Sequence, residues 1–215
     1  MTFALARCLD DPLALLAELD HHGRSGVLVG LAVVEEWQAL RQSVLAGAAP
    51  SSASIPGLGE PPGCGSSSDP IRQVLAAWGP AVVLGSGGSS GRRRWCLLPL
   101  RHLETSAEAT ASWLVAQGLD PGSCLHLAAL PLHHVSGLLP LIRCQRWGAE
   151  LRWLPPSLLR HPDLLPGACA LPSSRPVLLS LVPTQLRRLL ACPAATAWLA
   201  QCSVIWVGGA VLPDE

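Results

Sequence analysis

A segment rich in glycine, serine and arginine carries the strongest chemical signal in this sequence. Its residues are Gly85-Ser86-Gly87-Gly88-Ser89-Ser90-Gly91-Arg92-Arg93-Arg94. Glycines allow a tight turn that aims several backbone N–H groups at one anion, while serine hydroxyls and guanidinium groups add phosphate donors. The segment follows an apolar run at residues 81–84, as phosphate-binding loops of α/β proteins follow strands. A solvated hairpin tip is the other interpretation, because glycine–serine loops are common.

The same segment departs from the best-known nucleotide motifs. G-x-x-x-x-G-K-[ST] is excluded because the chain has no lysine, and G-x-G-x-x-G fails at Ser90. Residues 87–91 do fit the G-x-S-x-G elbow of α/β hydrolases, with Ser89 as the nucleophile. Partners for a hydrolase triad would come from Asp120 or Asp163 together with His161. The elbow needs a helix directly after the serine, whereas residues 95–98 predict a strand, so the hydrolase is the weaker alternative.

A histidine pair lies in a second motif, Pro131-Leu132-His133-His134-Val135-Ser136-Gly137. It falls between a strand pattern and a helix pattern, where α/β folds place ligand-binding loops. A histidine there could orient a carboxylate, but a core histidine with Ser136 as a helix cap is the simpler interpretation. A metal site would have to combine Cys124, His126, His133 and His134. That spacing matches no zinc pattern, and we expect no metal site.

The third motif is a strand that ends in a glycine pair, Val207-Gly208-Gly209-Ala210-Val211-Leu212-Pro213. Glycines at this place permit the close approach of a flat ligand or of another backbone. A tight turn without a ligand accounts for the same residues equally well.

Alternating strand and helix patterns predict an α/β fold with largely parallel sheets and flanking helices. Strand patterns cover residues 26–34, 81–84, 95–98, 124–130, 150–154, 177–181 and 204–207. Helix patterns cover residues 10–21, 35–45, 70–78, 102–117, 138–146 and 184–190, the last capped by Thr184. We expect an N-terminal α/β segment at 1–46, a Gly/Pro/Ser-rich loop at 47–69 and an incomplete α/β core at 70–215.

Composition excludes several classes of function. The chain has 215 residues with 15 basic and 15 acidic side chains, so it lacks the basic excess of a nucleic-acid binder. A long uncharged stretch, residues 121–142, contains prolines, glycines and histidines and is a poor membrane span. Eight dispersed cysteines and an N-terminus without a signal-peptide pattern indicate a reduced, cytoplasmic protein.

Taken in order, the motifs resemble those of the adenylate-forming superfamily of acyl-CoA synthetases, over roughly residues 81–215. Residues 86–91 resemble its T-S-G-T-T-G phosphate loop, with Arg92 and Arg94 in place of lysines, and His102 falls in its T-H-x-N segment. Residues 130–137 resemble P-L-F-H-x-x-G, residues 180–186 its V-P-T-x-L segment, and residues 208–213 G-G-A-x-L-P. The G-G-S-S-G and H-V-S-G forms look most like o-succinylbenzoate–CoA ligases of menaquinone and phylloquinone biosynthesis.

This resemblance implies the large N-terminal domain of such an enzyme and a reaction that uses ATP, Mg²⁺ and CoA on an aromatic carboxylic acid. The phosphate loop implied by it comprises Ser86, Gly87, Gly88, Ser89, Ser90, Gly91, Arg92 and Arg94. His134 would lie near the carboxylate and the α-phosphate as the catalytic residue, with Ser136 beside the acid. The acyl and adenine pocket would be lined by Gly208, Gly209 and Ala210.

Later motifs of the superfamily, including its adenylation lysine, have no counterpart in the sequence. We therefore expect this chain to be an N-terminal portion of a longer protein, a split subunit that works with a separate C-terminal half, or a homo-oligomer. We also expect that this chain alone binds ATP weakly and does not turn it over. A non-catalytic remnant that acts as a scaffold is the remaining alternative.

Overall fold

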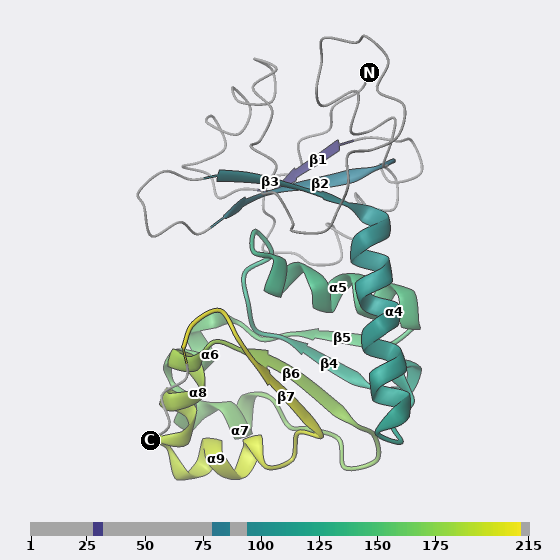
Figure 1. Ribbon diagram of the computed structural model, residues 1–215. Helices are drawn as coiled ribbons and strands as arrows, with labels where there is room; N and C mark the ends of the chain where they lie inside the picture. The colour runs from purple at the N-terminus through teal and green to yellow at the C-terminus, as the bar shows by residue number, and fades with distance from the viewer. Residues whose placement is uncertain (1–27, 32–78, 87–93, 212–215) are drawn as a thin grey trace, which may run out of the picture. The chain divides into compact units, whose positions relative to one another are not determined.

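The computed structural model describes residues 28–31, 79–86 and 94–211 (Figure 1). The chain forms two compact units, which are described separately. The first comprises residues 1–105 and 132–135, and the second comprises residues 106–131 and 136–215. The helices predicted at 10–21, 35–45 and 70–78, and the loop at 47–69, lie outside the described residues. No helix in the described ranges is both long and apolar enough to cross a membrane.

The first unit contains a three-stranded sheet with the order β1-β2-β3. Its strands are β1 (Leu28–Leu31), β2 (Ala81–Ser86) and β3 (Arg94–Pro99). The pairing of β1 with β2 is parallel and that of β2 with β3 is antiparallel. The predicted strands on either side of the glycine–serine segment are therefore confirmed, and they run in opposite directions.

The second unit contains a four-stranded sheet with the order β5-β4-β6-β7, in which every pairing is parallel. Its strands are β4 (Leu125–Ala128), β5 (Glu150–Trp153), β6 (Val177–Leu181) and β7 (Val204–Val207). All four residues of β4 are buried. A parallel strand covered on both faces needs apolar side chains in both directions, which accounts for its apolar residues on either side of His126. The predicted α/β fold with a parallel sheet is confirmed.

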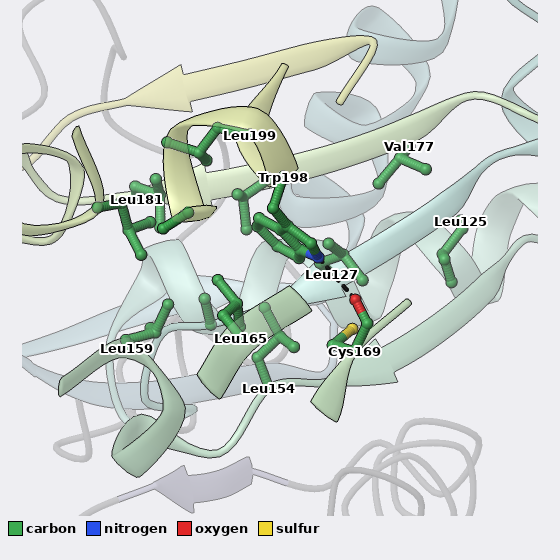
Figure 2. Close-up of a cluster of buried hydrophobic side chains, with 14 residues drawn as sticks. Leu125, Leu127, Leu154, Leu159, Leu165, Cys169, Val177, Leu181, Trp198 and Leu199 are labelled. Atoms are coloured by element: carbon green, nitrogen blue, oxygen red, sulfur yellow. Dashed lines mark hydrogen bonds between the residues drawn. The ribbon is translucent and has the colours of Figure 1, made fainter. Parts of the chain in front are cut away.

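One face of this sheet is covered by short helices: α6 (Pro156–Arg160), the 3₁₀ turn η3 (Pro162–Leu164), α7 (Leu165–Ala168), α8 (Pro183–Leu190) and α9 (Pro193–Leu199). Figure 2 shows the apolar core that they form with Leu125 and Leu127 of β4. Trp198 is its largest side chain, and its indole N–H donates a hydrogen bond of 2.6 Å to the carbonyl of Cys169. That bond satisfies the one polar group that the buried indole brings into the core.

The opposite face is covered by α4 (Leu100–Ala116) and α5 (Val135–Trp147), as Figure 1 shows. The two helices are tied together near the end of α5. The indole N–H of Trp147 donates to the carbonyl of Ala107 at 3.2 Å, and Arg146 forms an ion pair of 2.6 Å with Glu108. The 3₁₀ turn η2 (Pro121–Ser123) follows α4 and leads into β4.

Two predicted helix starts are wrong. Helix α5 begins at Val135 rather than at residue 138, so Ser136 is its second residue and cannot be its cap. Helix α8 is capped at Val182, not at Thr184, because the side chain of Gln185 accepts the Val182 N–H at 3.0 Å. Helices α6, α7 and α9 escaped prediction, since four to seven residues after a proline are too few to show a helical period.

Gly137, the third residue of α5, holds the turn after β4 against the start of the helix. A Cβ at this position would lie 2.1 Å from the carbonyl oxygen of Pro131 and 2.6 Å from that of Leu130. Both contacts are with backbone atoms, which cannot move aside as a flexible side chain could. Only glycine lets the chain turn this tightly between β4 and α5.

Replacing Gly137 with alanine should therefore destabilise the protein by about 3 kcal/mol or more through overpacking. Gly167 in α7 is the matched control, because its hypothetical Cβ meets nothing within 4 Å. Gly167→Ala should leave stability unchanged or raise it by about 0.5 kcal/mol. Urea unfolding followed by tryptophan fluorescence measures both variants, and equal stability of the two would contradict the assigned packing.

Candidate functional site

The carboxyl ends of the parallel strands β4, β5, β6 and β7 meet at one edge of the second sheet, here called the carboxyl edge. Backbone hydrogen bonds continue past the strands at this edge. Leu154 N–H donates to the carbonyl of Ala128 at 2.9 Å, and Gly208 N–H donates to that of Leu181 at 3.1 Å. Ligands of open α/β sheets bind at such an edge. The segments that follow β4, β6 and β7 contain three of the motifs found in the sequence.

The glycine pair lies directly after β7 at the carboxyl edge. Gly208, Gly209 and Ala210 are all exposed. Gly209 has φ +87°, and a Cβ there would lie 3.6 Å from Cγ1 of Val182, the residue that follows β6. The positive φ of Gly209 favours glycine over other residues. Because glycine has no side chain, only backbone atoms are presented at this position. Contact of this pair with a flat ligand remains a prediction, because a tight turn accounts for the same geometry.

The histidine pair immediately precedes α5 and belongs to the first compact unit. The rings of His133 and His134 lie 4.3 Å apart with an interplanar angle of 51°, and both side chains are half-buried. Ser136 is exposed in the first turn of α5. Neither histidine is a fully buried core residue, so the simpler interpretation, a core histidine beside a serine cap, does not describe this turn.

The glycine–serine loop is described only at its two ends. Ser86 is the last residue of β2, Arg94 is the first residue of β3, and the two are paired in register. The predicted phosphate ligands Gly87, Gly88, Ser89, Ser90, Gly91 and Arg92 lie outside the described residues. The proposed meeting of this loop with the histidine pair and the glycine pair remains a prediction.

The strand β3 also bears on the hydrolase alternative. It begins five residues after Ser89, where the nucleophile elbow would need a helix. The candidate partners are exposed as well, and Asp120 accepts the Gly122 N–H at 3.2 Å as the cap of η2. These features disfavour the hydrolase.

Metal-binding side chains do not gather in the part of the chain that the structure describes. No group of three or more His, Cys, Asp or Glu side chains lies together there. Magnesium would require carboxylate or other oxygen ligands. The described residues therefore do not by themselves form a site that fits Mg²⁺.

Sequence reasoning missed a buried polar cluster on the α4/α5 face of the sheet, formed by His126, Arg143, Trp147 and Trp206. His126 of β4 is fully buried, and its ring lies 5.7 Å from that of Trp206 and 6.4 Å from that of Trp147. The guanidinium of Arg143 lies 4.9 Å from the centre of the Trp206 ring. The signal that could have revealed the cluster is one histidine within an otherwise apolar strand.

Polar atoms of this cluster lack hydrogen-bond partners among the described residues. They are both ring nitrogens of His126 and Nε of Arg143. Burial lowers the pKa of His126 to about 3, and the nearby charge of Arg143 acts in the same direction. Burial also lowers the pKa of Arg143, but an arginine stays protonated in proteins. The cluster therefore combines a neutral imidazole with a cation that stacks on an indole ring.

Burial, nearby charge and hydrogen bonding also shift the pKa of other side chains in the described residues. Burial raises the pKa of Cys144 in α5 to about 12, so this thiol stays protonated and inert near neutral pH. In the first unit, burial and the adjacent Arg101 lower the pKa of His102, which is half-buried near the start of α4. At the opposite edge of the sheet, hydrogen bonding to Arg175 lowers the pKa of Glu150.

The buried neutral His126 should make folding stability depend on pH. In the unfolded chain this imidazole binds a proton below about pH 6.5, whereas in the folded chain it does so only below about pH 3. Its contribution is therefore fully present above pH 6.5 and is lost as the pH falls toward 3, at about 1 kcal/mol per pH unit. His126→Leu should flatten this dependence, because it removes the proton and the unpaired ring nitrogens together.

Urea unfolding between pH 7 and pH 4 measures the effect. His161→Gln is the matched control, because His161 is exposed and should leave the slope as in the unsubstituted chain. An unchanged slope in His126→Leu would show that other groups govern the acid sensitivity.

Comparison with known proteins gives relatives in sequence and in fold. No protein-family model matches the chain. Two proteins of Mycobacterium tuberculosis, from strains CDC 1551 / Oshkosh and ATCC 25618 / H37Rv, are named probable 2-succinylbenzoate–CoA ligase. Each is 33% identical over 133 residues, which are 62% of this chain and 33% of the relative. The chain thus spans about a third of the length of the curated relatives that it matches.

Solved structures extend the likeness over nearly the whole chain. An o-succinylbenzoate CoA synthetase from Bacillus subtilis, bound to a product analogue, has a TM-score of 0.60 at 15% identity, covering 98% of this chain and 44% of its own. A malonyl-CoA ligase with methylmalonyl-CoA and AMP bound has a TM-score of 0.58 at 22% identity, covering 98% and 47%. In sequence and in α/β fold, the chain is therefore similar to AMP-forming acid–CoA ligases, as its motifs predicted.

Proposed function

We propose that this chain is part of an acid–CoA ligase that activates 2-succinylbenzoate with ATP and transfers the acyl group to CoA, in menaquinone or phylloquinone biosynthesis. The observation that carries the proposal is the agreement between motif order and topology. The V-P-T-x-L and G-G-A-x-L-P motifs begin where the adjacent parallel strands β6 and β7 end, at Val182 and Gly208. The relatives at 33% identity are named for this reaction, which supports the substrate.

The reaction has two group-transfer steps. A carboxylate oxygen of the acid attacks the α-phosphorus of ATP, and pyrophosphate leaves to give an acyl-adenylate. The sulfur of CoA then attacks the acyl carbonyl, AMP leaves, and the thiol proton passes to solvent. Magnesium supplied with the nucleotide would neutralise phosphate charge. We assign the phosphates to residues 86–92 and Arg94, whose N–H, hydroxyl and guanidinium groups stabilise the charge of the leaving pyrophosphate.

The acid would occupy the carboxyl edge. We assign its reacting carboxylate to His134, its ring to Ser136 and the backbone of Gly208, Gly209 and Ala210, and its second carboxylate to Arg143. Arg143 suits this role because its half-buried guanidinium has no ion pair with an acidic residue in the described ranges. Its guanidinium lies over the ring of Trp206, which comes two residues before Gly208 in the sequence. Arg143 therefore lies beside β7, the strand that ends just before the glycine pair. The neutral His126 adds no competing charge.

The complete ligase would be cytoplasmic, and its remaining parts would come from further chain, a second subunit or a second copy. Without a lysine, this chain has no residue of the type that the superfamily uses for adenylation. We therefore expect no pyrophosphate release from ATP and 2-succinylbenzoate by the purified chain. Release at the rate of an intact ligase would refute that expectation.

Weak nucleotide binding by the chain is the first test of the proposal. ATP at ten times its Kd should raise Tm by about 3–6 °C. Replacing Ser89, Ser90 and Arg94 together by alanine should abolish the rise, as measured by differential scanning fluorimetry. Ser157, Arg160 and Ser173, which are exposed in the second unit, form a matched triple-alanine control that should keep it. No rise in the unsubstituted chain would favour the scaffold alternative, and labelling of Ser89 by a fluorophosphonate would favour the hydrolase.

Recognition of the second carboxylate is tested at Arg143. With ATP present, Arg143→Met should weaken the binding of 2-succinylbenzoate roughly 10- to 100-fold, because a charged hydrogen bond is lost. Arg146→Met is the control from the same helix, since Arg146 is paired with Glu108 instead. Isothermal titration calorimetry gives the affinities. An analogue without the second, non-reacting carboxylate should bind both variants alike, and an Arg143→Met variant with undiminished affinity for the diacid would exclude this arginine.

A further inference from the structure

Gln185 is the third residue of α8, and its side chain joins two segments of the carboxyl edge. Its Oε1 accepts the N–H of Val182 at 3.0 Å, directly after β6. Its Nε2 donates to the carbonyl of Ala129 at 3.5 Å, directly after β4. The two residues that it joins are 53 positions apart in the sequence (182 − 129) and come from neighbouring strands of the sheet. One amide group thus holds two loops of the edge in register.

Each of these segments supports a further part of the edge. Val182 is the side chain against which Gly209 packs, at 3.6 Å from a hypothetical Cβ. Ala129 begins the turn whose next two carbonyls, those of Leu130 and Pro131, lie against Gly137 at the start of α5. A shift of either segment would therefore move the backbone that leads to the glycine pair or to the histidine pair.

Helix capping explains only half of this arrangement. A cap at the start of α8 needs an acceptor for the Val182 N–H, and the oxygen of Gln185 supplies it. The bond from the amide nitrogen to Ala129 contributes nothing to that cap. It is long and individually weak, yet it crosses between two strands within a half-buried site.

We propose that Gln185 is a positioning residue that sets the geometry of the carboxyl edge for binding the acid. The proposal rests on the proposed function, because it takes this edge as the acid-binding site. Gln185 acts through Ala129 and Val182 and does not itself touch the acid. The amide of Gln185 supplies both a hydrogen-bond acceptor, Oε1, and a donor, Nε2. An apolar side chain of the same size supplies neither.

The substitution Gln185→Glu separates capping from positioning. A glutamate keeps the acceptor for Val182 and adds negative charge at a helix N-terminus, so α8 should be at least as stable. At pH 8 its carboxylate has no donor and repels the carbonyl of Ala129. A role in capping alone would leave the segment after β4 undisturbed.

The control is Gln201→Glu. Gln201 is exposed, and its Nε2 donates to the carbonyl of Ala197 at 3.3 Å within its own turn of chain. The two substitutions make the same chemical change, but only Gln185 joins separate strands. Each variant is compared with the unsubstituted chain at the same pH, so that the acid sensitivity caused by His126 cancels.

Hydrogen exchange tests the positioning itself without any ligand. In Gln185→Glu at pH 8, amide exchange at residues 129–130 and 208–211 should accelerate about 5- to 10-fold. Gln201→Glu should exchange normally in both segments. Unchanged exchange in Gln185→Glu overturns the proposal.

Binding of 2-succinylbenzoate in the presence of ATP then tests the connection to function. The affinity of Gln185→Glu should fall about 10-fold at pH 8, whereas Gln201→Glu should keep the affinity of the unsubstituted chain. If exchange changes while the affinity does not, Gln185 does not position the acid site and the proposal is wrong. If the unsubstituted chain binds no acid while exchange still responds, the proposed function fails and the register held by Gln185 stands.

Discussion

Burial of β4 on both faces is the constraint on which the rest of the second unit depends. Its odd-numbered residues, Leu125 and Leu127, belong to the core beneath α6 to α9, while His126 lies beside Trp147 and Trp206 on the other face. A strand fixed in this way cannot slip by one residue without exchanging its two sets of side chains. The turn that follows β4 is consequently held at a definite place on the carboxyl edge, and Gly137 lets the chain enter α5 there without a clash.

The two faces of the second sheet differ in the polar groups that they bury. The face beneath α6 to α9 is apolar, and its one indole N–H is satisfied by Cys169. The α4/α5 face buries an imidazole and part of a guanidinium whose atoms lack partners among the described residues. Unpaired buried polar groups cost stability, so packing alone gives no reason to keep them. The proposed binding of the second carboxylate of the acid by Arg143 would account for the guanidinium.

Sequence patterns predicted the larger elements of this fold and few of its contacts. Parallel strands such as β6 and β7 were found within one residue, because a continuous apolar run bounded by turn residues is typical of a buried strand. Within the predicted helix 102–117, Leu114 is fully buried whereas the next apolar residue, Val115, is 62% exposed, since periodicity cannot tell which edge of an apolar stripe meets solvent. The contact of Gln185 with Ala129 could not be predicted at all. It depends on the strand order, which places β4 beside β6, and no local pattern encodes that order.

An α/β sheet with a ligand-binding edge hosts many chemistries, so the fold alone does not select a ligase. Two features of different origin narrow the choice of function. The motifs lie along the chain in the order of the adenylate-forming superfamily, a property of sequence. Arg143 lies half-buried on an indole beside a neutral His126, a property of packing that no motif required. A monocarboxylate would need only the group that reacts, whereas a diacid needs a second, permanently charged partner away from the phosphates. The proposed assignment of Arg143 therefore favours an acid with two carboxylates over one with a single carboxylate and an apolar tail.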